Sequence, residues 1–384
     1  MLKGTAATNG VPLHKSMSDQ LPQFFTVFNV VRIFVVATVA FFVCLVLTPL
    51  WLKFLKKYKL GKQIRSDTAF KSLHTEGGPI AAKLHQNKEG TPTMGGFLIW
   101  FPVALLTLVF WYLAESVDGF WSQFNFFSRG QTWLPFGALI IAGLVGMWDD
   151  YLGILRKGPK GGGLSMLYQL FLYLLVAIGG AWWFYYKLEF NSINIPFLGD
   201  WVVGWWYIPI FVFVIVATSF SANETDGLDG LAAGTFLTMF AAYGVIAFDQ
   251  GRMDLVVFIA AIIGALVAFL WFNIFPAKFF MGATGSMPLG VLLGVIAMLT
   301  NTPLLLIPIG IIFIIESGSV IFQLLAKRLR GKKIFLSTPI HHHFEALGWP
   351  ESQVTMRFWM INAIGAIIGI IIFLVDSKIP PLFR

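Results

Sequence analysis

Acidic side chains gather at two points in a chain that has few of them. Asp149 and Asp150 close an apolar run, and a second pair, Asp226 and Asp229, lies in the segment 223–230. Adjacent carboxylates at a helix end repel each other unless a cation lies between them. Interfacial charge and helix capping are the ordinary alternatives. Four acids in two clusters favour a site for a divalent cation, and oxygen ligands suit Mg²⁺ better than Zn²⁺.

Three consecutive histidines, His341–His343, form a third cluster in a chain with six histidines. Successive side chains on a helix point about 100° apart, so the three cannot all bind one metal ion from a regular helix. We therefore expect hydrogen bonding to phosphate or acid–base chemistry rather than a zinc site.

Further groups could complete a site for phosphate. Lys88 precedes the turn Thr91–Gly96 and offers a point charge. Gly282 and Gly285 precede a helix, which is a weak signal for an anion-binding turn. Phe280 could stack on a base, although a core aromatic is the commoner role. Carboxylates, a divalent cation, cationic donors and imidazoles together are typical of phosphoryl transfer.

Apolar runs long enough to cross a membrane must position these groups. Hydrophobic residues make up 57% of the 384, and charged residues 12%, about half the charged fraction of a soluble domain. The runs are continuous rather than alternating, which favours helices over strands. We predict an all-α polytopic membrane protein with about ten transmembrane helices and a cytoplasmic-side active-site cleft. The predicted spans are 28–50, 95–114, 132–148, 166–186, 205–221, 229–248, 253–275, 286–300, 303–326 and 355–376.

The basic residues indicate how these spans are oriented. Nineteen of the 27 Lys and Arg residues lie in or beside the connections on one side. The positive-inside rule places that side in the cytoplasm and both termini outside. The acidic clusters, Lys278 and the histidines fall on the same side, so we expect an active site that faces the cytoplasm, where an anionic soluble substrate meets a lipid.

The polar gaps are too short to fold independently. The sequence therefore predicts one transmembrane catalytic domain, 28–376, between an extracytoplasmic segment, 1–27, and a tail, 377–384. No cleavable signal peptide is expected, and the single cysteine, Cys44, cannot form an internal disulfide. The net charge of +8 does not indicate nucleic acid, because the cations follow the topology.

The segments together resemble one family. The chain is similar to the bacterial phospho-N-acetylmuramoyl-pentapeptide transferases, within the polyprenyl-phosphate N-acetylhexosamine-1-phosphate transferase superfamily. The resemblance implies transfer of phospho-N-acetylmuramoyl-pentapeptide from UDP to undecaprenyl phosphate, giving lipid I and UMP in peptidoglycan synthesis. It covers residues from about 28 to 376 and is carried by Thr91–Gly96, Asp149-Asp150, Asp226–Gly230, Phe275–Ser286 and His341–Glu345, in this order.

The resemblance also implies Mg²⁺ as cofactor and a homodimer in the bacterial cytoplasmic membrane. Asp149, Asp150 and Asp226 are then expected to be catalytic and close to the metal, with His341 handling phosphate. Direct attack and a covalent intermediate both stay open. The implied substrate contacts, with Phe280 near the uracil, are Lys88, Thr93, Asn223, Gly227, Leu228, Asp229, Asn273, Phe280, His342 and His343.

Two positions depart from the family pattern. Family members have Asp, a principal Mg²⁺ ligand, where this chain has Ala283. A methyl group cannot coordinate a cation, so we expect poor Mg²⁺ binding and weakened or abolished activity, whether the substitution is natural or engineered. Phe220 stands where family members often have Asn, which puts a polar contact there in doubt.

Other functions stay open on the sequence alone. A transferase that uses UDP-N-acetylglucosamine would share the acids, but His341–His343 and Thr91–Gly96 argue against it. Transporters place ionisable residues near the bilayer midplane, whereas here they lie at loop ends. Ala283 leaves open a catalytically silent, lipid-binding scaffold.

Overall fold

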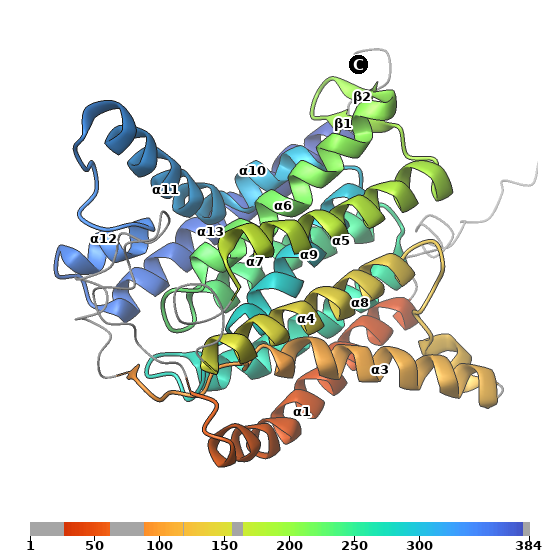
Figure 1. Ribbon diagram of the computed structural model, residues 1–384. Helices are drawn as coiled ribbons and strands as arrows, with labels where there is room; N and C mark the ends of the chain where they lie inside the picture. The colour runs from red at the N-terminus through yellow and green to blue at the C-terminus, as the bar shows by residue number, and fades with distance from the viewer. Residues whose placement is uncertain (1–26, 62–87, 118, 156–163, 379–384) are drawn as a thin grey trace, which may run out of the picture.

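The computed structural model describes residues 27–61, 88–117, 119–155 and 164–378. Within them nearly all of the regular secondary structure is helical, and the helices follow the apolar runs of the sequence (Figure 1). The all-α class of membrane protein is thereby confirmed. The helices are α1 (Val27–Lys57), α3 (Phe97–Ser116), α4 (Trp133–Ile154), α5 (Met166–Lys187), α6 (Tyr207–Thr225), α7 (Leu231–Asp249), α8 (Met253–Asn273), α9 (Ala283–Leu299), α10 (Leu306–Ile309), α11 (Ile311–Arg330), α12 (Ile340–Ala346) and α13 (Glu351–Lys378).

Each of the ten predicted spans overlaps a helix, but two of them differ from simple spans. Among the described residues eight helices are long and apolar enough to cross a membrane, or nine if one bent pair counts as a span. That pair, Pro303–Ile309 and Ile311–Arg330, bends by 85° at Gly310, which leaves helical geometry. Helix α9 has 17 residues, or about 26 Å at roughly 1.5 Å per residue, less than the ~30 Å of a hydrocarbon core.

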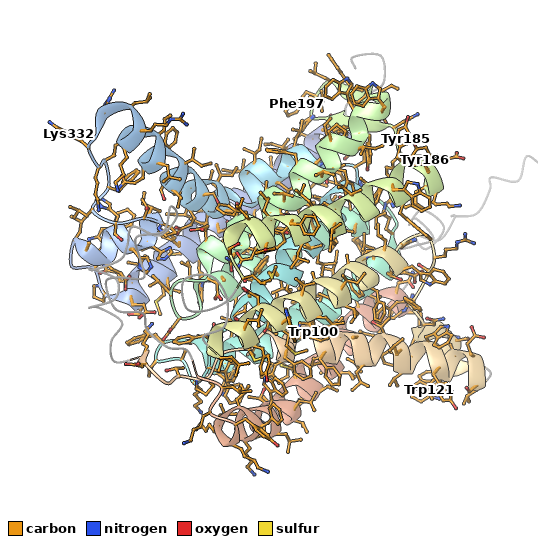
Figure 2. The ribbon with its side chains drawn as sticks, in the orientation of Figure 1. Trp100, Trp121, Tyr185, Tyr186, Phe197 and Lys332 are labelled. Atoms are coloured by element: carbon orange, nitrogen blue, oxygen red, sulfur yellow. The ribbon has the colours of Figure 1, made fainter. Side chains whose placement is uncertain are left out.

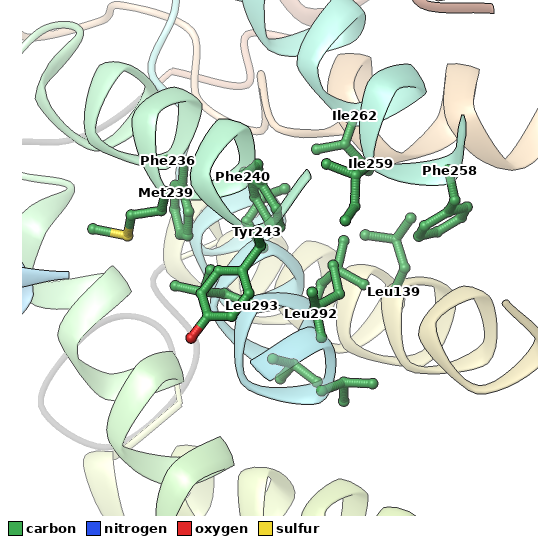
Figure 3. Close-up of a cluster of buried hydrophobic side chains, with 14 of the residues drawn as sticks. Leu139, Phe236, Met239, Phe240, Tyr243, Phe258, Ile259, Ile262, Leu292 and Leu293 are labelled. Carbon is green, nitrogen blue, oxygen red and sulfur yellow. The ribbon is translucent and has the colours of Figure 1, made fainter. Parts of the chain in front are cut away.

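Helix α9 is the centre of the bundle. All of its residues are buried, and it packs against α4 and α6. Figure 3 shows Leu292 and Leu293 of α9 among large side chains of neighbouring helices, including Leu139 and Phe240. A Cβ added at Gly146 of α4 would lie 2.1 Å from the carbonyl oxygen of Ala283. Small residues thus let the helices approach closely, as in other membrane bundles.

The two ends of the bundle carry different side chains. Trp121, Tyr185, Tyr186 and Phe197 lie toward one end (Figure 2). Lys332 lies toward the other, where the basic last turn of α11 ends.

Phe197 belongs to a hairpin that the sequence analysis did not predict. Its antiparallel strands are β1 (Ser192–Ile195) and β2 (Gly199–Val202), with Ile195 opposite Gly199. The N–H of Phe197 donates to Asp376 Oδ1 of α13 at 2.9 Å. The hairpin is thereby fixed to the last helix.

Several sequence predictions lie outside the described residues. They include nearly all of the extracytoplasmic segment 1–27 and the end of the tail from residue 379. The same holds for seven of the cations used to orient the spans, which are Lys62, Arg65, Lys71, Lys83, Arg156, Lys157 and Lys160.

Candidate active site

Two of the expected catalytic acids meet at the start of α9. Asp150, from α4, accepts hydrogen bonds from the N–H groups of Ala283 (3.1 Å) and Thr284 (2.9 Å), and from Thr284 Oγ1 (2.6 Å). Asp226, at the end of α6, accepts one from the N–H of Gly282 at 2.9 Å. The first N–H groups of a helix lack intrahelical partners and carry the positive end of its dipole. Carboxylates from two other helices therefore cap α9.

Asp149 faces a different neighbour of α4. Its Oδ1 accepts a hydrogen bond from the N–H of Leu164 at 2.6 Å, and its Oδ2 accepts one from Gln169 Nε2 at 2.8 Å. Consecutive helical side chains diverge by about 100°, so Asp149 and Asp150 take separate partners. Asp149 thereby ties the end of α4 to the start of α5.

This arrangement of acids does not fit a bound magnesium ion. All four carboxylate oxygens of Asp149 and Asp150 accept hydrogen bonds from protein groups. Across the stretches that the structure describes, no three His, Cys, Asp or Glu side chains could hold a metal ion. Ala283 supplies only a methyl group where the family resemblance implies a ligand. The magnesium site expected from Asp149, Asp150 and Asp226 stays a prediction.

The methyl group of Ala283 packs in a small cluster of mostly apolar side chains. Ala283 is buried in a small cluster with Tyr173 and Met287. The hydroxyl of Tyr173 is buried and has no hydrogen-bond partner among the described residues. Buried hydroxyl groups normally have a partner. A carboxylate at position 283 would therefore have a hydrogen-bond donor in the same cluster.

The turn before α3 lies against the turn before α9. Phe280 N–H donates to Pro92 O, Gly95 N–H donates to Phe280 O, and Gly96 N–H donates to Met281 O, at 2.8 to 2.9 Å. A Cβ on Gly282 would come within 2.8 Å of Thr93 Oγ1 and 2.4 Å of Asp150 Oδ2. The segment Thr91–Gly96 thus lies beside Asp150 and the start of α9.

Lys88 and Asp229 form an ion pair beside this turn. Lys88 Nζ lies 2.8 Å from Asp229 Oδ1 and 2.5 Å from Glu351 Oε1 of α13. Asp229 Oδ2 accepts a hydrogen bond from the N–H of Ala277 at 2.9 Å. The ammonium is also 5.8 Å from the ring centre of Phe280, a distance at which a cation interacts with an aromatic face.

Asparagines hold the loops around this pair. Asn273 accepts a hydrogen bond from Gly230 N–H at 3.1 Å and donates one to Phe279 O at 2.9 Å. Asn223 Oδ1 accepts one from Ser286 Oγ at 3.4 Å. Leu228 is buried in an apolar cluster with residues of α11 and α13. Asn273 and Asn223, which were predicted to contact the substrate, thus hold the loops before α7 and α9 in place.

His341 forms a buried pair with an acid of α11. Its Nδ1 lies 2.9 Å from Glu316 Oε2, and both side chains are almost completely buried. The other face of the imidazole lies against the 226–230 loop, because a Cβ on Gly227 would be 2.2 Å from His341 Nε2. Only glycine allows this approach. Gly227 therefore lets His341 pack against the residue that follows Asp226 in the chain.

The next two histidines have other partners. His342 Nδ1 lies 2.7 Å from Glu345 Oε2 on the same short helix. His343 Nδ1 accepts a hydrogen bond from Leu336 N–H at 3.2 Å, and its ring packs edge-on against Phe335. His343 thus holds the 334–336 segment, and its expected substrate contact stays a prediction.

Comparisons with known proteins identify the family. Residues 132–301 match the family described as Glycosyl transferase family 4. A Phospho-N-acetylmuramoyl-pentapeptide-transferase of Listeria monocytogenes is 39% identical over 338 residues, covering 86% of this chain and 95% of the relative. Enzymes of the same name from Geobacillus thermodenitrificans and Chloroflexus aurantiacus are 37% and 35% identical, covering 89% and 90% of this chain and 98% and 91% of the relatives.

The chain belongs to the phospho-N-acetylmuramoyl-pentapeptide-transferase family. Within this transferase, the connections before α3 and α9 and the short helix α12 lie at the same end of the bundle (Figure 1). The segments singled out in the sequence therefore converge. In the described part of the transferase, Asp150, Asp226 and His341 are linked through the start of α9 and the 226–230 loop.

Two site residues of the transferase were missed by sequence reasoning. Glu316, the partner of His341, lies inside the apolar run 303–326, and an acid within a membrane span is itself a signal of function. That signal could have identified it. Glu351, the partner of Lys88, opens α13. Acids are common at that position because of the helix dipole, so no sequence pattern singles it out.

Proposed function

We propose that this protein transfers phospho-N-acetylmuramoyl-pentapeptide from its UDP-linked donor to undecaprenyl phosphate, giving lipid I and UMP. An oxygen of the lipid phosphate forms a new bond to the sugar-bearing phosphorus of the donor. The bond between that phosphorus and the bridging oxygen breaks, and UMP leaves with that oxygen. Family membership supports the reaction class, and the convergence of Asp150, Asp226 and His341 at one end of the bundle is the observation that carries it.

The residue roles in this proposal follow the groups around that convergence. Asp149, Asp150, Asp226 and His341 act on the reacting phosphates. The nucleotide and its phosphates are contacted by a second set around the 226–230 loop. That set comprises Lys88, Thr93, Asn223, Gly227, Leu228, Asp229, Asn273, Phe280, His342 and His343.

In our proposal, Ala283 gives this protein a lower transferase activity than other members of its family. Mg²⁺ is the expected cofactor, but the acids as arranged do not fit it and no step is derived through it. A catalytically silent scaffold is the second candidate, favoured by Ala283 and by the hydrogen bonds that already occupy Asp149 and Asp150. The weakened transferase should become active when aspartate replaces Ala283, whereas the silent scaffold should stay inactive.

The test is UMP release from UDP-N-acetylmuramoyl-pentapeptide, with undecaprenyl phosphate and Mg²⁺, by the chain and by Ala283→Asp. We expect Ala283→Asp to raise turnover by on the order of 100-fold, because a bound metal supplies several kcal/mol of charge stabilisation. It should also bind Mg²⁺ more tightly, as read from a magnesium titration of its thermal unfolding.

Ala283→Asn is the matched control, because it has nearly the same size as aspartate but no charge. Equal turnover in all three proteins would remove the proposed effect of Ala283. Absence of UMP release from every one of them, with each folded, would favour the silent scaffold. A preference for UDP-N-acetylglucosamine in donor competition would replace the proposed substrate.

The surroundings of the reaction complete the proposal. The protein is a multi-pass membrane protein, and we place it in the bacterial cytoplasmic membrane with the site facing the cytoplasm and both termini outside. Residues 28–376 act as one catalytic domain, and two copies form a homodimer. The basic last turns of α1 and α11, at the end of the bundle that carries the site, support this orientation.

A further inference from the structure

One face of α13 is bonded to the loop that carries Asp229. Glu351, Thr355 and Trp359 follow one another at four-residue intervals, which places them on one side of a helix. Glu351 Oε1 accepts a hydrogen bond from Asp229 N–H at 2.7 Å, and Thr355 Oγ1 donates to Asp229 O at 3.3 Å. Trp359 Nε1 donates to the carbonyl oxygen of Gly230 at 3.2 Å. Three successive turns of α13 thus fix residues 229 and 230.

Glu351 differs from the other two because it also reaches Lys88. The same Oε1 atom that accepts from the backbone of Asp229 lies 2.5 Å from Lys88 Nζ. Its side chain is 9% exposed, and that of Asp229 is 3% exposed. A charge-assisted hydrogen bond this well shielded from water is stronger than an exposed one. Glu351 therefore sets where the ammonium and the loop lie relative to each other.

The charge balance of this group limits what Lys88 can do. One ammonium lies between the carboxylates of Asp229 and Glu351, so its positive charge is already compensated. A phosphate placed here would face net negative charge. The ammonium can still donate a hydrogen bond of fixed direction, because it has three donors. Its contribution is thus geometric, in contrast to the point charge for phosphate that the sequence suggested.

We propose that Glu351 is a positioning residue, which holds Lys88 and the 229–230 loop in the arrangement that receives the uridine part of the donor. The proposal rests on the proposed function, because that function makes Lys88 and Asp229 contacts of the nucleotide. Glu351 acts through these two residues and does not itself touch the reacting phosphates.

The test is equilibrium binding of radiolabelled UMP and uridine to the purified full-length protein in detergent. Glu351→Gln keeps an oxygen that can accept from Asp229 N–H but removes the charge beside Lys88. Glu351→Ala removes both. We expect dissociation constants for UMP and uridine to rise by the same factor, severalfold in Glu351→Gln and about tenfold or more in Glu351→Ala. The first variant weakens the hydrogen bond to Lys88 and the second removes it.

A purely structural role for Glu351 would look different. It would lower the unfolding temperature and the active fraction while leaving the dissociation constants of the folded protein unchanged. In the Ala283→Asp background, positioning predicts a higher KM for the UDP-linked donor, with kcat and the KM for undecaprenyl phosphate unchanged. Glu351→Asp, which keeps the charge on a shorter side chain, should recover part of the affinity lost in Glu351→Ala. Gln353→Ala, exposed on the same helix, is the control and should match the parent.

Each outcome separates this inference from the proposed function. If the parent binds UMP and both variants bind it equally well, the role of Glu351 is refuted and the proposed function stands. If Glu351→Gln binds UMP more tightly while uridine is unaffected, Lys88 serves the phosphate and the positioning role is wrong. If the folded parent binds neither compound, the proposed function itself fails and this role fails with it.

Discussion

Glu316 and His341 are buried together beside the 226–230 loop. Glu316 Oε2 fixes Nδ1 of the imidazole at 2.9 Å, and Gly227 lies against the opposite nitrogen. A histidine whose one nitrogen is held by a carboxylate has a defined tautomer and ring orientation. Glu316 thus orients His341, the histidine that lies against Gly227 of the 226–230 loop.

We predict that this pair is strongly coupled in stability. Glu316→Ala and His341→Ala should each destabilise the protein by roughly 3–5 kcal/mol, because removal of one partner leaves the other buried and uncompensated. The double variant should lose less than the sum of the two. Unfolding by denaturant in detergent measures this, with Glu115→Ala, an exposed acid of α3, as the control. Strictly additive losses would show that the pair does not interact.

For single residues, the sequence predicts well which residue types lie together in the site. It predicts their hydrogen-bond partners less well. Asp150, Asp226 and His341 were identified because acids and histidines are rare in an apolar chain. Their partners could not be identified, because Asp150 bonds the backbone of Ala283 and Thr284, and backbone groups leave no sequence pattern. The separation of Asp149 from Asp150 likewise depends on where α5 begins.

Glycine contacts set the spacing of the elements that carry the site. The start of α3 meets the start of α9 so closely that a Cβ on Gly96 would lie 2.1 Å from Gly285 Cα. The contact is between two backbones, so no side chain can move aside. This closeness allows the Thr91–Gly96 turn to bond residues 280 and 281.

Gly96→Ala should therefore destabilise the protein by about 1–3 kcal/mol, the usual cost of overpacking, and reduce UMP binding. Gly137→Ala is the matched control. Gly137 lies inside α4 with nothing within 4 Å of an added Cβ, and alanine there should be neutral or stabilise by about 0.5–1 kcal/mol. Thermal unfolding of both variants gives the comparison. Similar unfolding temperatures would contradict the tight backbone contact.

Hydrophobic length predicts the position of helices better than their shape. All ten predicted ranges overlap helices, yet the 85° bend near Gly310 was not foreseen. A hydropathy profile shows how long an apolar run is, but it does not show whether the helix bends within that run. The hairpin of β1 and β2 was missed for a related reason, since its tether to Asp376 joins residues 179 positions apart.

For the whole molecule, orientation is the property that the sequence predicts and that labelling can test. The native cysteine, Cys44, is buried, so an added exposed cysteine should be the only reactive one. Lys332→Cys should react with a membrane-impermeant maleimide only in inside-out vesicles. Gln123→Cys, exposed near Trp121, should react only in right-side-out vesicles. Unmodified protein is the control, and the reverse pattern would invert the proposed topology.

The shortness of α9 has a consequence for how the two substrates meet. A helix of 17 residues reaches about 26 Å, which is about 4 Å less than a hydrocarbon layer ~30 Å thick. Asp150 and Asp226 cap its first turn and share its depth. Missing length at the end that they cap would place these acids at the level of the lipid head groups. A polyprenyl phosphate would then need little vertical travel, and the soluble donor would make most of the approach.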